Sequence, residues 1–176
     1  LDFLGINYYT RVFVTRLGLP GVPLKALPGY VEIERILGPW LFKALGGKRG
    51  DRERTDMGWE IVPEGLERVV TRFWNAYRLP ILITENGLAD STGSRREAYL
   101  RSHLAALGRA MSAGADVRGY LHWTLLDNYE WGSYAPKFGL FHVDKRNNFE
   151  RTPAPGADFY GRVAKSGELP EPEILK

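Results

Sequence analysis

The chain has 176 residues, of which 44% are hydrophobic and 26% charged, as is normal for a globular domain with a sizeable core. The absence of cysteine excludes disulfides, zinc–thiolate sites and cysteine nucleophiles. A net charge of +3, with basic and acidic residues mixed, argues against nucleic-acid binding, and no apolar run approaches the roughly 18 residues of a membrane span. We expect a cytoplasmic protein, although any targeting signal upstream of Leu1 is not readable.

The first predicted element is a strand from Phe3 to Tyr9, whose alternation places Asn7 and Tyr9 on one face. Residues 10–58 form a long connection rich in glycine and proline. Within it, Val31 to Leu45 could form one or two helical turns, broken near Gly38-Pro39. Loops of this length in a compact domain are usually functional or mobile, so we interpret it as a partly ordered cover.

A helix is predicted to begin at Pro63, where the missing N–H costs nothing. Its apolar residues recur at steps of three and four: Leu66, Val69, Val70, Phe73, Trp74 and Tyr77. Leu79-Pro80 ends it, and the apolar run Ile81 to Thr84 predicts a buried strand. A second helix follows over about Ser94–Ser112, with a predicted inner face of Leu100, Leu104, Leu107 and Met111.

The third predicted strand runs from Val117 to Thr124, followed by a loop to Lys137 that is dense in aromatic and polar residues. Phe138 to Asp144 predicts a short strand or hairpin, and Asp158 to Ser166 a last helix. Strands alternating with helices indicate a parallel sheet with right-handed crossovers. Three strands cannot close a barrel and would leave both edges open, so the pattern indicates part of a larger barrel.

Polar and aromatic residues follow the three strand ends, which should meet at one edge of the sheet. Glu85 is a carboxylate held by a rigid strand, and Gly87 lets the chain turn after it. The Tyr9 hydroxyl can donate to Glu85 and favour the ionised form that a nucleophile needs. Trp123 offers a flat face for a sugar ring, and Glu130 can accept two hydroxyl hydrogen bonds. The set fits a neutral, polyhydroxylated ligand.

Each of these residues also has a structural interpretation. Glu85 alone could equally cap a loop or pair with an arginine, and a tryptophan at a strand end is more often part of the core. Asp127 and Asn128 are more typical of turns. We interpret His122, which should face the helices, as structural. The coincidence of three such clusters at strand ends favours the functional interpretation.

Four stretches carry a resemblance to a known family: residues 4–10, residues 55–60, Ile83 to Gly87 and Gly119 to Trp131. Together they resemble glycoside hydrolase family 1, the retaining β-glycosidases, and Thr84-Glu85-Asn86-Gly87 is among the specific pieces. The resemblance implies an α/β fold, the (β/α)8 TIM barrel. Residues 1–176 would be the C-terminal part of one such barrel, with strands six to eight and their helices.

The resemblance also implies roles for individual residues. Glu85 matches the nucleophile that forms a glycosyl-enzyme intermediate, and Tyr9 matches the tyrosine that orients it. Trp123 matches the platform beneath the sugar. The other implied substrate-binding residues are Asn7, Glu130, Trp131 and Phe138. Glu130 and Trp131 would hold sugar hydroxyl groups, and no metal or organic cofactor is implied.

Retaining hydrolysis also needs a second carboxylate, which family 1 places in an Asn-Glu-Pro motif that this chain lacks. We therefore expect the 176-residue chain alone to be inactive and its partner to be the N-terminal remainder of the barrel. The expected substrate is a β-glucoside, β-galactoside or related oligosaccharide. Residues 29–50 depart from the family's shorter loops, which leaves the aglycone open. The alternatives are a non-catalytic sugar-binding fragment and a transglycosidase on the same scaffold.

Overall fold

The computed structural model describes residues 1–11, 14–15, 31–32 and 52–169. The chain divides into two compact units, residues 1–10 with 53–176 and residues 11–52. In the second unit, β2 (Val14–Thr15) pairs antiparallel with β3 (Val31–Glu32). The helical turns predicted from Val31 are wrong for Val31 and Glu32, which are extended by this pairing, and the rest of that prediction lies outside the described residues.

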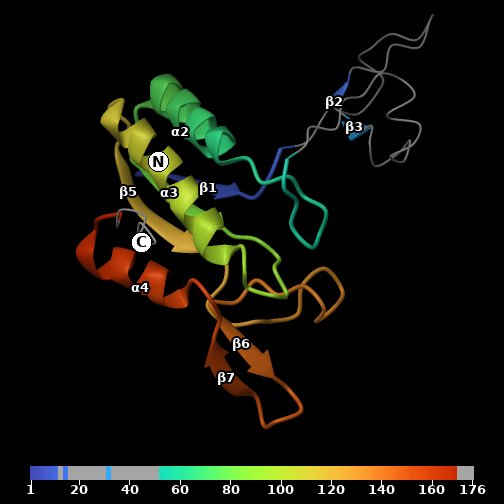
Figure 1. The fold of residues 1–176 in the computed structure, drawn as a ribbon. Coiled ribbons are helices and arrows are strands. Elements are labelled where there is room, and N and C mark those ends of the chain that lie inside the picture. Colours follow the sequence, from blue (N-terminus) through green and yellow to red (C-terminus); the bar gives the residue numbers. More distant parts are fainter. Residues whose placement is uncertain (12–13, 16–30, 33–51, 170–176) are drawn as a thin grey trace, which may run out of the picture. The chain divides into compact units, whose positions relative to one another are not determined.

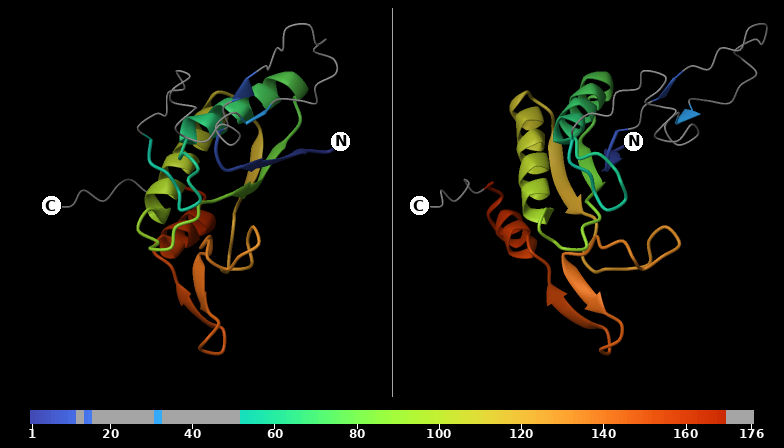
Figure 2. Two further views of the ribbon diagram at one scale, coloured as in Figure 1. Left: turned by 90° about the vertical axis from the view of Figure 1, so that its right-hand side faces the viewer. Right: turned by 45° about the vertical axis from the view of Figure 1, so that its right-hand side comes forward.

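The first unit is built on a three-stranded parallel sheet in the order β1 (Leu4–Tyr8), β4 (Ile81–Asn86), β5 (Val117–His122). Helices α2 (Pro63–Tyr77) and α3 (Arg96–Ser112) lie side by side over one face of this sheet (Figures 1 and 2). The predicted alternation of strands and helices is confirmed. Pro63 occupies the first turn of α2, as its missing N–H favours.

The hydrophobic core lies between the sheet and the two helices. Ile6, Ile81 and Ile83 face Leu66 and Val70 of α2, and all five are buried. Burying side chains of this size contributes about 1.5–3 kcal/mol each. A smaller cluster joins Leu100 of α3 to Phe159 of α4 (Ala157–Ser166).

Two parts of the predicted helix faces are wrong. Met111 is 48% exposed, because Ala106 and Ala110 supply the buried contacts near the C-terminal end of α3. Phe73 and Tyr77 of α2 are exposed and stack on each other, with ring centroids 6.0 Å apart. Helical spacing marks a face, but it does not say where the sheet beneath that face ends.

After β5, the chain forms a long loop and then a hairpin of β6 (Phe141–Asp144) and β7 (Glu150–Pro153). The predicted short strand is confirmed over Phe141–Asp144, and it forms a hairpin whose second arm, β7, lies beyond the predicted range. The ring of His122 lies 5.9 Å from that of Tyr160 in α4, on the helix side of the sheet, as expected for a structural histidine. No helix in the described part of the chain is long and apolar enough to cross a membrane.

Strand β4 has one more residue than both of its neighbours near its C-terminal end. Ile83 pairs with Ile6 and Tyr120, and Asn86 pairs with Tyr8 and His122. Between these two rows β4 has residues 84 and 85, whereas β1 has only residue 7 and β5 only residue 121. Such a bulge places two consecutive side chains on the same face and re-aims those that follow.

The face of the sheet opposite the helices is called the inner face here and carries Gly5, Leu82, Thr84, Gly119 and Leu121. Each glycine on this face lies directly against a side chain of β4. An added Cβ at Gly5 would contact Thr84, and one at Gly119 would lie 2.5 Å from the Leu82 side chain. Leu121 is 53% exposed on this face. The inner face therefore has a layer of small and apolar side chains below the strand ends.

Buried His103 makes the stability of the fold depend on pH. It is fully buried on α3, stacked on Tyr99 at 3.8 Å, and its burial lowers its pKa to about 4. In the unfolded chain the same imidazole has a pKa near 6.5. The free energy of unfolding is therefore highest above that pH and decreases as the pH falls toward 4, because only the unfolded chain binds the proton. We expect the free energy of unfolding to be lower at pH 5 than at pH 7 by about 2 kcal/mol because of His103.

Urea unfolding of the protein and of His103→Phe at both pH values checks this expectation. The variant keeps an aromatic ring for stacking but has no proton to bind, so it should lose less stability on acidification. Equal losses for the two proteins would contradict the assignment to His103.

Candidate active site

The centre of the candidate site is the contact between Glu85 and Tyr9. The Tyr9 hydroxyl donates a hydrogen bond of 2.6 Å to Glu85 Oε2, joining the ends of β4 and β1. Burial raises the pKa of Tyr9 well above its usual value, and the carboxylates of Glu85 and Glu130 add to this effect. Tyr9 thus stays a neutral hydrogen-bond donor to Glu85.

The bulge in β4 brings Glu85 to this position. Strict alternation would put it on the same face as Ile81 and Ile83, which are buried beneath the helices. Instead, Thr84 and Glu85 both reach partners on the inner-face side. The Thr84 hydroxyl donates to Asn7 Oδ1 at 2.5 Å, and Glu85 accepts from Tyr9. Asn7 itself is exposed and sits one residue before Tyr8 in the neighbouring strand.

Four aromatic rings form an aromatic wall beside Glu85: Tyr9, Trp59, Trp131 and Phe138. Tyr9 meets Trp59 and Phe138 edge to face, with centroids 5.7 and 6.2 Å apart. Trp59 also meets Trp131 edge to face at 5.8 Å. Separations of this kind are favourable for aromatic pairs. The structure thus places Phe138 against Tyr9, and Trp131 at the far side of Trp59.

Trp59 was not among the predicted site residues. It lies in the loop before α2, in a stretch that gave no strand or helix pattern, so its position could not be worked out from periodicity. The signal available was that it falls within residues 55–60, one of the four stretches that carried the family resemblance. A tryptophan inside such a stretch but outside a regular element is a candidate for a site wall.

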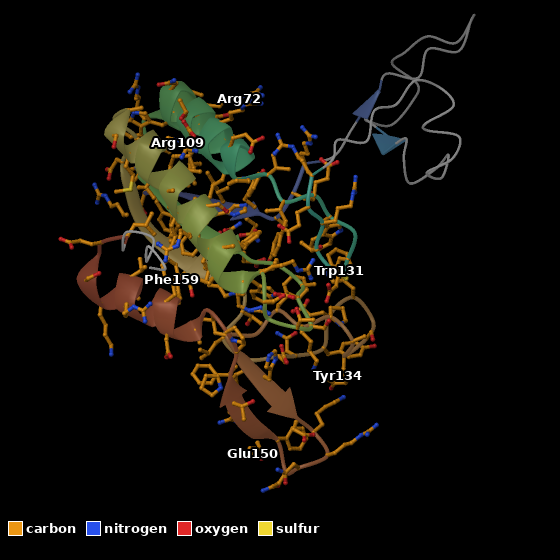
Figure 3. The ribbon with its side chains drawn as sticks, viewed as in Figure 1. Arg72, Arg109, Trp131, Tyr134, Glu150 and Phe159 are labelled. Atoms are coloured by element: carbon orange, nitrogen blue, oxygen red, sulfur yellow. The ribbon has the colours of Figure 1, made fainter. Side chains whose placement is uncertain are left out.

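Trp123 and Glu130 are joined directly. The Trp123 indole N–H donates to Glu130 Oε1 at 2.8 Å, across the first part of the loop after β5. Glu130 is further held by reciprocal backbone hydrogen bonds with Ser133. Trp131 follows with a φ of 51° and is 74% exposed, on the outer part of this loop (Figure 3). The Oε1 oxygen of Glu130 thus already accepts a hydrogen bond from the Trp123 indole.

The loop that carries these residues is fixed by buried charges. Asp127 accepts a hydrogen bond of 2.9 Å from the Gly139 backbone, forms an ion pair with Lys137 and lies 3.2 Å from His142 Nδ1. Arg96 is fully buried and donates to the carbonyl oxygens of Asp90, Lys137 and Gly139. The structural interpretation of Asp127 agrees with these contacts, because they hold the segment around Phe138 in place.

A hollow of about 430 Å³ lies on another part of the same unit, lined by residues that include Ser91, His142 and Glu150. It contains none of the predicted site residues. Within the described part of the chain, no three histidine, aspartate or glutamate side chains are arranged to hold a metal ion.

The sequence model of glycosyl hydrolase family 1 matches residues 1–169. The chain belongs to this family. A β-galactosidase of Sulfolobus acidocaldarius is 39% identical over 97% of the chain, and these residues cover 33% of that relative. A galactolipid galactosyltransferase of Arabidopsis thaliana is 35% identical over 96% of the chain, covering 24% of its own length.

Among solved structures, the β-glucosidase of Pyrococcus furiosus superposes with a TM-score of 0.74 at 42% identity, covering 97% of this chain and 34% of that one. The chain therefore spans between about a quarter and a third of the length of these relatives. The fold class is the (β/α)8 barrel, to which β1, β4 and β5 contribute three parallel strands with their helices. The prediction that all 176 residues form one domain stays a prediction.

Gly87 offers a test of how tightly this site is packed. An added Cβ there would lie 1.8 Å from the Trp123 carbonyl oxygen, so β4 or the end of β5 would have to move. We expect Gly87→Ala to lower the free energy of unfolding by about 1–3 kcal/mol, as overpacking does. Thermal and urea unfolding measure the effect.

The matched control is Gly108→Ala in the middle of α3, where an added Cβ would meet no described atom within 4 Å. This change should stabilise the protein by roughly 0.5–1 kcal/mol, the helix preference of alanine over glycine. If Gly87→Ala were as harmless as Gly108→Ala, the close approach to Trp123 would be wrong.

Proposed function

We propose that the chain supplies the nucleophile and much of the sugar-binding surface of a retaining β-glycosidase acting on β-glucosides or β-galactosides. The observation that carries this proposal is the 2.6 Å hydrogen bond between Tyr9 and Glu85 at the strand ends, beside the aromatic wall. Family membership and the names of the β-galactosidase and β-glucosidase relatives support it.

In this proposal Glu85 attacks the anomeric carbon of the bound sugar. Tyr9 holds Oε2, so Oε1 is the oxygen that forms the new bond to carbon as the bond to the aglycone oxygen breaks. The aglycone oxygen takes a proton from a second carboxylic acid, about 5–5.5 Å from the nucleophile in retaining enzymes. That group then removes a proton from water, which attacks the glycosyl-enzyme and releases Glu85.

The second carboxylate is proposed to come from the remainder of the barrel. General acid–base catalysis is typically worth about 10²–10⁴-fold, so the 176 residues alone should give little or no turnover. The proposed partner is therefore the N-terminal part of the same barrel. No metal or organic cofactor enters the proposed reaction, and a cytoplasmic location stays a prediction from the sequence.

We assign the sugar contacts to the residues around Glu85. Trp123 would stack beneath the ring. Glu130, anchored through Oε1, would accept sugar hydroxyl groups with Oε2, and the exposed Trp131 indole would donate to another. Asn7 and Phe138 would line the same pocket. Trp59 joins this proposal because it connects Tyr9 to Trp131.

A second candidate is transglycosylation, in which an alcohol or a second sugar takes the place of water. The galactosyltransferase of Arabidopsis thaliana favours it as an alternative, since it is 35% identical to this chain. The two reactions share the glycosyl-enzyme and differ in the acceptor. Product analysis with a competing alcohol separates them, because a hydrolase releases mainly free sugar.

Glu85→Gln in the whole enzyme should abolish nearly all turnover while preserving folding. The amide keeps the size of the side chain and an oxygen that can accept from Tyr9, but it cannot attack as an anion. Hydrolysis of an aryl β-glucoside, with circular dichroism to check folding, measures the effect. Substantial remaining activity would exclude Glu85 as the nucleophile.

Glu130→Ala should lower kcat/KM by a factor that corresponds to roughly 1–3 kcal/mol of transition-state stabilisation, because the Trp123 indole and the sugar hydroxyl groups lose their acceptor. It should also weaken the discrimination between gluco- and galacto-configured substrates. The control Glu130→Gln keeps an oxygen that can accept from the Trp123 indole. If Glu130→Gln keeps Trp123 in place but still loses the selectivity between gluco- and galacto-configured substrates, the Glu130 carboxylate contacts the sugar directly. Unchanged selectivity in both variants would contradict the proposed contact.

A further inference from the structure

Asn86 is the residue next to Glu85, and its side chain makes three hydrogen bonds. It is fully buried on the helix side, where its amide N–H groups donate to the Tyr8 carbonyl oxygen at 2.7 Å and the Tyr99 hydroxyl at 2.8 Å. Its Oδ1 accepts from the Tyr120 hydroxyl at 2.7 Å. One amide therefore connects β4 to β1, β5 and α3.

The backbone around Asn86 is fixed as well. Its carbonyl oxygen accepts from the Trp123 N–H at 3.0 Å. The next residue, Gly87, leaves no room for a Cβ beside the Trp123 carbonyl oxygen. The peptide between Asn86 and Gly87, one residue beyond Glu85, is thus held against the end of β5.

These bonds decide on which face Glu85 lies. Asn86 occupies the helix-side position that strict alternation along Ile81 and Ile83 would give to Glu85. A one-residue slip to regular pairing would turn Glu85 into the apolar layer under the helices and expose the amide. An asparagine satisfies all three partners at this position, because it offers two donors and an acceptor without a charge.

We propose that Asn86 is a positioning residue for the reaction: its amide, held by Tyr8, Tyr99 and Tyr120, fixes the bulge in β4 that presents the Glu85 carboxylate to the sugar. This inference rests on the proposed function, because it assigns a purpose to the geometry of the proposed nucleophile. Asn86 contacts neither the Tyr9 hydroxyl nor the aromatic wall through the bonds described above. Its effect on the reaction runs through the backbone of Glu85.

The test uses single-oxygen deletions in the whole enzyme. Tyr120→Phe removes the donor to Asn86 Oδ1 and leaves the ring in place. The matched control is Tyr160→Phe in α4. It removes a hydroxyl that donates to the backbone carbonyl oxygen of Tyr120 at 3.1 Å and leaves the hydrogen bonds of Asn86 intact. The readouts are kcat, KM and the rate at which a 2-deoxy-2-fluoro-β-glucosyl fluoride labels Glu85, detected by peptide mass.

We expect Tyr120→Phe to lower kcat and the labelling rate about tenfold, with KM changed less than twofold, because the carboxylate is misaimed while the sugar contacts remain. Tyr160→Phe should leave all three within about twofold. A loss of stability would lower the folded fraction and with it the apparent kcat, but it would not change the first-order rate constant with which the folded enzyme is labelled. The labelling rate therefore separates a misaimed carboxylate from a loss of folded enzyme.

Two outcomes overturn the proposal in different ways. If the unaltered enzyme is labelled on Glu85 but Tyr120→Phe behaves like Tyr160→Phe, the positioning role of Asn86 is wrong and the proposed function stands. If the unaltered enzyme turns over substrate without any label on Glu85, the nucleophile assignment fails and the inference fails with it.

Discussion

The site depends on one feature of strand pairing, the extra residue in β4. A regular strand in this sheet would direct Glu85 into the core, where an unpaired carboxylate costs several kcal/mol. The bulge turns it to the opposite face, and the price of interrupting the ladder is offset by the hydrogen bonds of Asn86 with its three tyrosine partners. Core and candidate site are thus two faces of the same short stretch.

The two halves of the candidate site are built differently. Glu85 and Tyr9 stand at the ends of neighbouring strands, and their separation follows from the pairing of those strands. Trp123, Glu130 and Trp131 belong to a loop, so their positions need separate anchors. Asp127 and Arg96 supply them with hydrogen bonds to backbone groups on either side of Phe138. Rigid strands hold Glu85, the proposed nucleophile, and buried charges hold the loop that carries the proposed sugar contacts.

Much of this could be predicted from the sequence. Apolar runs and the 3.6-residue period placed the three strands and the helices, and strand ends located Glu85 and Tyr9. The bulge could not be predicted, because residues 81–86 read as an ordinary buried strand whether or not a residue is added to the pairing. Trp59 was missed for a related reason: its position results from the path of a loop. Met111 was misplaced because periodicity does not give the extent of the sheet.

The aromatic wall has a consequence for altering substrate preference. Trp59 touches Tyr9, which binds the nucleophile candidate, and Trp131, which lies at the exposed end of the wall. A smaller side chain at Trp59 would enlarge the entrance and also release the ring that packs against Tyr9. In the proposed glycosidase, selectivity for the leaving group and reactivity of the carboxylate would therefore be linked through Trp59. Variants chosen for a wider entrance would need a second change that restores the support of Tyr9.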